Sequence, residues 1–219
     1  MVRLELKNKK IVFLGDSITE GIGVSNPDNL YWNQIAKRTG AQCYGYGIGG
    51  TRIAPQHTPS QEGDQYFGSR ISDMIPDADA IVVFGGTNDF GHGDAPLGIM
   101  SDRTSDTFYG ALHTLYTSLI CRYPCARIVI LTPLHRCGEG KSAEKQPGTE
   151  NLPLIRYVEA IREVAEYYAL PVLDLFAMSG LQPNVPVIKK MYLPDGLHPN
   201  DTGHKRIAEM IVGFLQSLL

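Results

Sequence analysis

A serine that could act as a nucleophile lies at the end of the first apolar segment. In Gly15-Asp16-Ser17, the glycine permits a tight turn, and a helical turn after it would aim backbone N–H groups toward the serine side chain. Such N–H groups stabilise the oxyanion that forms when a serine attacks an ester. A helix cap made by Asp16 and Ser17 explains the same residues. The motif alone therefore does not establish a catalytic role.

A matching base and its orienting carboxylate lie near the other end of the chain. Asp195 precedes His198 by three residues, and Gly196 eases the turn that brings the carboxylate to the imidazole Nδ1–H. The other ring nitrogen can then accept a proton from a serine hydroxyl. A loop histidine with only a structural role is the alternative. Pro199 and Asn200 suit the start of a following helix.

Two glycine-containing segments supply candidate oxyanion donors. Asn88, in Gly86-Thr87-Asn88-Asp89, carries a side-chain amide that can donate to a developing oxyanion, whereas Asp89 is expected to tie its loop through backbone N–H groups. Residues 45–50 formally match GxGxxG, but Pro55 and Pro59 follow soon after, where a dinucleotide site requires a helix. We therefore expect a substrate-contacting backbone N–H in this segment and no dinucleotide.

Short apolar runs alternate with helical stretches along the whole chain. Continuous apolar character predicts strands, and three- or four-residue spacing predicts helices. The expected strands are 10–14, 41–46, 80–84, 127–131 and 171–174, and the expected helices include residues 108–119, 155–165 and 207–218. This order predicts one domain, residues 1–219, with a parallel sheet between two helix layers. Ligands bind at the carboxyl ends of such strands, which is where all four motifs fall.

Composition argues against several other classes of protein. The 219 residues carry a net charge of −3 and no long basic run, so neither nucleic acid nor a membrane is an expected partner. Cys43, Cys121, Cys125 and Cys137 form no CxxC pair, and we expect small buried hydrophobic side chains in a reducing cytoplasm. His92 and Asp94 supply too few ligands for a metal. No cofactor is expected.

Taken in order, these motifs resemble those of the SGNH (GDSL-type) hydrolase superfamily. Gly15-Asp16-Ser17 is similar to its first block, Gly50 to the glycine of its second, Gly86-Thr87-Asn88-Asp89 to GxND, and Asp195-Gly196-Leu197-His198 to DxxH. The resemblance implies a five-stranded parallel sheet of flavodoxin-like order. It also implies a Ser17 nucleophile, a His198 base oriented by Asp195, and an oxyanion hole of Ser17, Gly50 and Asn88. The adjacent Gly49 is the alternative to Gly50 as the oxyanion donor.

The substrate is less defined by the sequence. No long apolar loop offers a slot for an acyl chain, and the expected site is bordered by polar residues such as Arg52 and His135, which are candidate substrate contacts. We therefore expect a small-molecule ester, with a short acyl group such as acetyl, on an alcohol such as a carbohydrate. A lysophospholipase or thioesterase with the same machinery is one alternative, and a non-catalytic binding module is another. Without an apolar leader segment, we expect a cytoplasmic protein.

Overall fold

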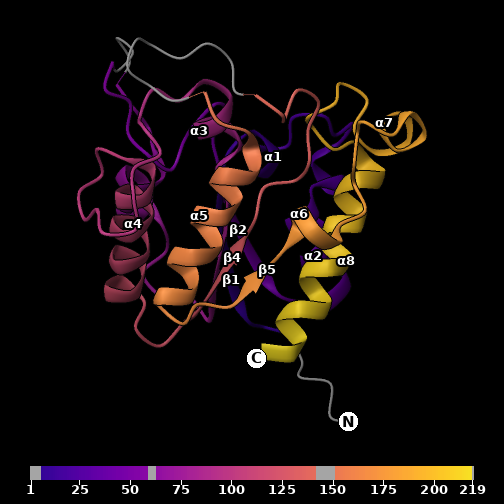
Figure 1. Ribbon diagram of the computed structural model, residues 1–219. Coiled ribbons are helices and arrows are strands. Elements are labelled where there is room, and N and C mark those ends of the chain that lie inside the picture. The colour runs from indigo at the N-terminus through magenta and orange to yellow at the C-terminus, as the bar shows by residue number, and fades with distance from the viewer. Residues whose placement is uncertain (1–5, 59–62, 142–150, 219) are drawn as a thin grey trace.

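A computed structural model of the protein describes residues 6–58, 63–141 and 151–218. Its strands are short, the three central ones are buried, and its longest helices lie on the two faces of one sheet (Figure 1). The strands are β1 (Lys10–Gly15), β2 (Gln42–Gly47), β3 (Ala80–Phe84), β4 (Arg127–Leu131) and β5 (Val172–Leu173). The helices are α1 (Ser17–Glu20), α2 (Tyr31–Thr39), α3 (Thr87–His92), α4 (Phe108–Arg122), α5 (Leu154–Tyr167), α6 (Leu175–Met178), α7 (Pro186–Tyr192) and α8 (Asp201–Leu218), with 3-10 turns η1 (Pro27–Asn29) and η2 (Phe67–Asp73).

The sheet is parallel throughout and has the order β2-β1-β3-β4-β5, which confirms the predicted flavodoxin-like arrangement. All five strands lie within one or two residues of the predicted ranges. The expected run 171–174 contributes only Val172 and Leu173, because Asp174 ends the strand. Its carboxylate accepts a hydrogen bond from the N–H of Ala177 and so caps α6.

Alternating side chains of each strand supply two separate cores. Val12, Leu14, Ile81 and Val83 point into the core that α4 and α5 cover. Their neighbours in the strands point to the opposite face, where α2 and α8 cover them. Because both faces of β1, β3 and β4 are buried, these strands are apolar at almost every position, which is why they appear in the sequence as continuous runs, whereas the edge strand β2 is partly exposed.

The cysteine prediction is wrong for two of the four residues. Cys121 and Cys125 are exposed, while Cys43 and Cys137 are half-buried, and all four are free thiols. Cys121 lies in the last turn of α4, where Leu119 faces the core and Cys121 and Arg122 face solvent. Cys125 lies in the turn between α4 and β4. The apolar stripe of a helix does not extend to every residue in its final turn.

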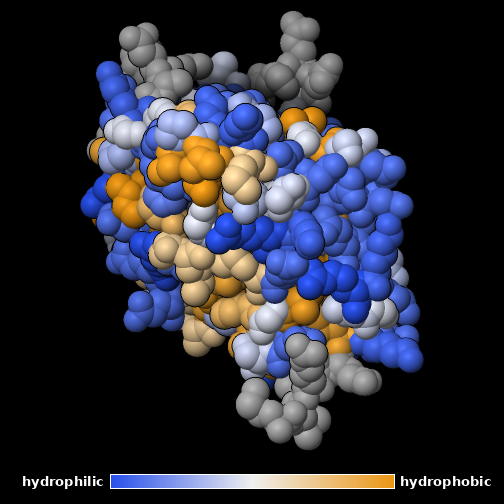
Figure 2. All heavy atoms as spheres, turned by 90° about the vertical axis from the view of Figure 1, so that its right-hand side faces the viewer, coloured by the Kyte–Doolittle hydropathy of each residue, from blue (hydrophilic) through white to orange (hydrophobic). Residues whose placement is uncertain are grey.

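The surface over α7 and α8 is mostly hydrophilic, with apolar patches between the polar side chains (Figure 2). Val187 and Met191 of α7 are among the exposed large hydrophobic residues. Within the described ranges, no helix has the length and apolar character needed to cross a membrane.

Candidate active site

Ser17 is the first residue of α1, and only Asp16 separates it from the carboxyl end of β1. The Asp16 carboxylate caps this helix by accepting a hydrogen bond from the N–H of Ile18 at 3.0 Å. The capping explanation of this motif therefore applies to Asp16 and leaves the hydroxyl of Ser17 available. A side chain at Gly47 would collide with the backbone of Glu20, so glycine lets β2 pass close beside α1.

His198 and Asp195 form a local unit in the turn that precedes α8. The Nδ1 atom of His198 lies 2.7 Å from Oδ2 of Asp195, and Oδ1 of Asp195 accepts hydrogen bonds from the N–H groups of Leu197 and His198. Partial burial raises the pKa of Asp195, but these hydrogen bonds outweigh it and hold that pKa below 3.8. Asn200 accepts from the N–H of Thr202 and so caps α8 immediately beyond the turn.

The fold brings these two ends of the chain together. Oγ of Ser17 lies 3.1 Å from Nε2 of His198, across 181 positions of sequence. Both residues line a cavity of about 430 Å³ whose wall also includes Gly49, Gly50 and Asn88. A hydroxyl bonded to an imidazole, whose other nitrogen is bonded to a carboxylate, can lose its proton as it attacks an electrophile.

Four residues with hydrogen-bond donors line the cavity at this hydroxyl, namely Ser17, Gly49, Gly50 and Asn88. The N–H of Ser17 is at the start of α1, and within the described part of the chain it donates to no protein group, nor do those of Gly49 and Gly50. Gly50 has a φ of +74°, which completes the turn from Ile48 to Thr51 and favours glycine. The Asn88 amide donates one hydrogen to the carbonyl of Thr51 at 3.0 Å, leaving its second hydrogen for the cavity.

Two buried charged residues hold the loops of the site together. Asp89 accepts hydrogen bonds from the N–H groups of Ile53 and Ala54, so it ties the loop after β3 to the loop after β2. Arg70 of η2 donates to the carbonyls of Gly15 and Tyr46, and to other acceptors at Gln65 and Thr51. The sequence predicted a loop-tying role for Asp89 but gave no signal for Arg70.

Burial perturbs the acids beneath the site. It raises the pKa of Asp16 to about 7 and that of Asp89 to about 6, although backbone N–H groups oppose both shifts. Burial also lowers the pKa of Arg70 to about 10, with Asp16 acting in the opposite direction. These groups lie under the cavity wall and are absent from its lining, so we assign them structural roles.

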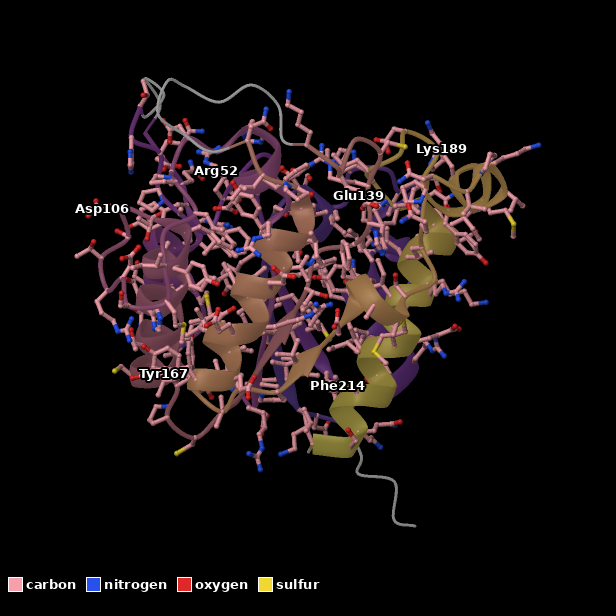
Figure 3. The ribbon with its side chains drawn as sticks, in the orientation of Figure 1. Arg52, Asp106, Glu139, Tyr167, Lys189 and Phe214 are labelled. Carbon is pink, nitrogen blue, oxygen red and sulfur yellow. The ribbon has the colours of Figure 1, made fainter. Side chains whose placement is uncertain are left out.

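The two predicted substrate contacts lie away from the cavity at Ser17. Arg52 forms an ion pair with Asp64 at 2.9 Å and lines a separate hollow beyond Gly50. His135 bonds to Glu139 at 2.8 Å, and its ring packs on Phe176 with 3.7 Å between centroids. Figure 3 shows Arg52 and Glu139 at the end of the molecule where the strands finish, so both are near the site without lining it.

The residue after His135 lines the cavity instead. Arg136 lies in its wall together with Ile22, His92 and Leu197.

Asp94, a candidate metal ligand by sequence together with His92, accepts hydrogen bonds from two backbone N–H groups, those of His57 and Thr58. In the ranges that the structure describes, no three His, Cys, Asp or Glu side chains gather as a metal site.

Comparisons with known proteins identify the family of this chain. The sequence profile of the GDSL-like lipase/acylhydrolase family matches residues 13–206, from β1 into α8. A comparison with curated proteins gives no match.

Several solved structures share the fold. A protein from Lactobacillus plantarum is 31% identical with a TM-score of 0.82, over 97% of this chain and 99% of that one. A lipase/acylhydrolase from Enterococcus faecalis is 21% identical with a TM-score of 0.66, over 96% and 97%. A two-domain esterase active on acetylated mannans is 20% identical with a TM-score of 0.64, over 95% of this chain and 48% of that one. Because the family profile spans most of the sequence, this chain belongs to the GDSL-like lipase/acylhydrolase family.

Proposed function

We propose that the protein is a serine esterase that hydrolyses short-chain acyl esters of small molecules through an acyl-enzyme. The observation that carries this proposal is the continuous hydrogen-bonded chain from Ser17 through His198 to Asp195, with its hydroxyl end in an open cavity. Membership of an acylhydrolase family supports the same reaction type.

In the first half of the proposed reaction, Oγ of Ser17 attacks the ester carbonyl while its proton passes to Nε2 of His198. The carbonyl oxygen becomes an oxyanion within reach of the N–H groups of Ser17 and Gly50 and of the Asn88 amide. The tetrahedral intermediate then collapses: the bond to the alcohol oxygen breaks, and the alcohol leaves with the proton from His198.

In the second half, water takes the place of Ser17 as the nucleophile. His198 accepts a proton from the water while the water oxygen attacks the acyl carbon, and then returns that proton to Ser17 as the acid leaves. Asp195 keeps the imidazole in the tautomer that carries its proton on Nδ1, and stabilises the imidazolium that forms twice in each cycle.

We propose a short acyl group, acetyl above all, because the described wall of the cavity has only Ile22 and Leu197 as large aliphatic residues. A long acyl chain needs a larger apolar surface to repay its transfer from water. The esterase active on acetylated mannans shares the fold of this chain at 20% identity. Its activity supports an acetylated carbohydrate as one candidate substrate.

A fluorophosphonate probe tests the mechanism without knowledge of the natural substrate. We expect covalent labelling of the folded protein at Ser17, and loss of both labelling and esterase activity in Ser17→Ala. Ser72→Ala, which changes an exposed serine of η2, is the matched control. Esterase activity that survives Ser17→Ala would disprove the mechanism, and an absence of labelling in the wild type would favour a binding module.

Chain length is tested with para-nitrophenyl acetate and para-nitrophenyl octanoate. We expect the acetyl ester to have the higher kcat/KM. A clear preference for octanoate would instead indicate a lysophospholipase- or thioesterase-type acylhydrolase with the same machinery.

A further inference from the structure

Arg136 is held at the cavity wall by contacts with α3. Its Nη1 atom donates to both the carbonyl and the hydroxyl of Thr87, each at 3.1 Å. The guanidinium also lies over the ring of Phe90, 5.4 Å from its centroid. A Cβ atom at Gly91 would lie 2.9 Å from Nη1, so glycine leaves room for the guanidinium. These contacts fix the group beside the cavity that contains Ser17.

This half-buried cation has no acidic partner among the described residues. Two other partly buried arginines have one: Arg52 pairs with Asp64 at 2.9 Å and Arg162 with Asp174 at 2.7 Å. Within the part of the chain that the structure describes, Arg70 is buried without an acidic partner, but all three of its side-chain nitrogens donate to neutral acceptors. Nε of Arg136 is buried without a hydrogen-bond partner, and no protein acceptor for Nη2 occurs in the described ranges. An unpaired charge out of water is costly, and a guanidinium does not escape that cost by losing its proton.

Two carboxylates act on Arg136 through space without pairing with it. Burial lowers the pKa of Arg136, and Asp16 and Asp195 oppose that shift. Asp16 is itself buried and caps α1, and Asp195 is bonded to His198. Neither is free to serve as the partner of Arg136, so the described residues supply no counter-charge, and we look for it in a ligand of the cavity.

We propose that Arg136 binds a carboxylate carried by the ester substrate, and so makes the enzyme selective for anionic esters. The inference rests on the proposed function, since it concerns the same cavity. A carboxylate fits better than a phosphate monoester, because Arg136 is the one Lys or Arg in the described lining and a single guanidinium neutralises a single charge. The carboxylate belongs to either the acyl part or the alcohol part of the substrate.

Two pairs of esters separate these sources. For the acyl part, the para-nitrophenyl ester of succinate is compared with that of methyl succinate. For the alcohol part, para-acetoxybenzoate is compared with its methyl ester. In each pair we measure kcat/KM after subtracting spontaneous hydrolysis, and take the ratio of the anionic to the neutral ester. Comparing this ratio between variants cancels both intrinsic reactivity and any general loss of activity.

In one pair, we expect the wild type to favour the anionic ester and Arg136→Gln to lower the ratio about tenfold or more, as loss of a charge-assisted hydrogen bond implies. Arg136→Lys keeps the charge but not the planar fork, so it should recover part of the ratio. Arg38→Gln removes the same charge from an exposed ion pair on α2 and should leave the ratio unchanged. Ratios equal within about twofold in wild type and Arg136→Gln, in both pairs, would overturn the proposal.

The same experiments distinguish failure of the anion site from failure of the proposed esterase mechanism. If Ser17→Ala abolishes hydrolysis of the neutral esters but Arg136→Gln leaves the ratios unchanged, only the anion site is wrong. Direct binding gives a second readout that requires no catalysis. By calorimetry, the Ser17→Ala protein should bind para-hydroxybenzoate or monomethyl succinate more tightly than the corresponding neutral amide, and Arg136→Gln added to it should remove the difference. Equal affinity for acid and amide in both series would also overturn the proposal.

Discussion

Replacing Asp195 with asparagine reverses one hydrogen bond and keeps two. The oxygen of the asparagine can still accept from the N–H groups of Leu197 and His198, as Oδ1 of Asp195 does at 2.8 and 2.7 Å. Its NH2 group then faces Nδ1 of His198, where Oδ2 now lies. Since an NH2 group only donates, Nδ1 must become the acceptor, and the ring proton moves to Nε2. In that tautomer His198 cannot take the proton of Ser17.

The magnitude follows from the 2.7 Å separation of Nδ1 and Oδ2. At an effective permittivity of about 20, a carboxylate at that distance stabilises an imidazolium by about 6 kcal/mol. The Asp195 side chain is 53% exposed, and with solvent screening we take about half of that value, about 3 kcal/mol. The reversed hydrogen bond adds about 1 kcal/mol. A total of about 4 kcal/mol corresponds to a loss of about a thousandfold in kcat/KM.

The assay is hydrolysis of para-nitrophenyl acetate by Asp195→Asn. The substituted asparagine would precede Gly196, a sequence prone to deamidation, so mass spectrometry must show that no aspartate has formed again. Asp195→Ala is the matched variant that cannot revert. Unchanged thermal unfolding shows that a loss is catalytic. A kcat/KM within about tenfold of wild type would refute the role assigned to Asp195.

Three further predictions concern the residues around the nucleophile. Burial raises the pKa of Asp16 from 3.8 to about 7, so the folded state binds a proton that the unfolded state releases, and stability falls as pH rises through that interval. Asp16→Asn should remove this loss, so that above pH 7 its free energy of unfolding by denaturant exceeds that of the wild type by up to about 4 kcal/mol. If the free energy of unfolding depended on pH in the same way in both proteins, the pKa shift of Asp16 would be contradicted. Asn88→Ala removes one oxyanion donor and should lower kcat by about 10²–10³ with little change in KM; an effect confined to KM would argue against that role. Arg70→Lys cannot match the four acceptors of the guanidinium and should cost about 2–4 kcal/mol in urea unfolding, unless water replaces the lost donors, in which case stability is retained.

The sheet and the motif loops could be predicted because their physical requirements are local. A strand buried on both faces must be apolar at each position, so β1, β3 and β4 are continuous runs in the sequence. A parallel sheet places the carboxyl ends of its strands at one edge, and this alone brings the loops after β1 and β3 together.

Arg70 could not be predicted, because its acceptors are backbone carbonyls and a hydroxyl from separate segments of the chain. Any residue type can supply a carbonyl, so no pattern marks such an anchor. The cavity-lining position of Arg136 could not be predicted for a different reason, which involves its neighbour His135. They are neighbours in a loop without regular periodicity, and only the loop conformation decides that His135 turns to Glu139 while Arg136 faces the cavity.

The short separation between Asp195 and His198 has a consequence for heat inactivation. The turn carries its own hydrogen bonds, so this pair can persist while the segment between α7 and α8 moves as a unit. Of the contacts that link Ser17, His198 and Asp195, the 3.1 Å contact with Ser17 is the one that depends on distant parts of the chain. Mild heating that loosens this segment would abolish activity by separating the intact Asp195–His198 pair from Ser17, at a temperature below that at which the sheet unfolds. Activity lost in that way should return on cooling without refolding of the core.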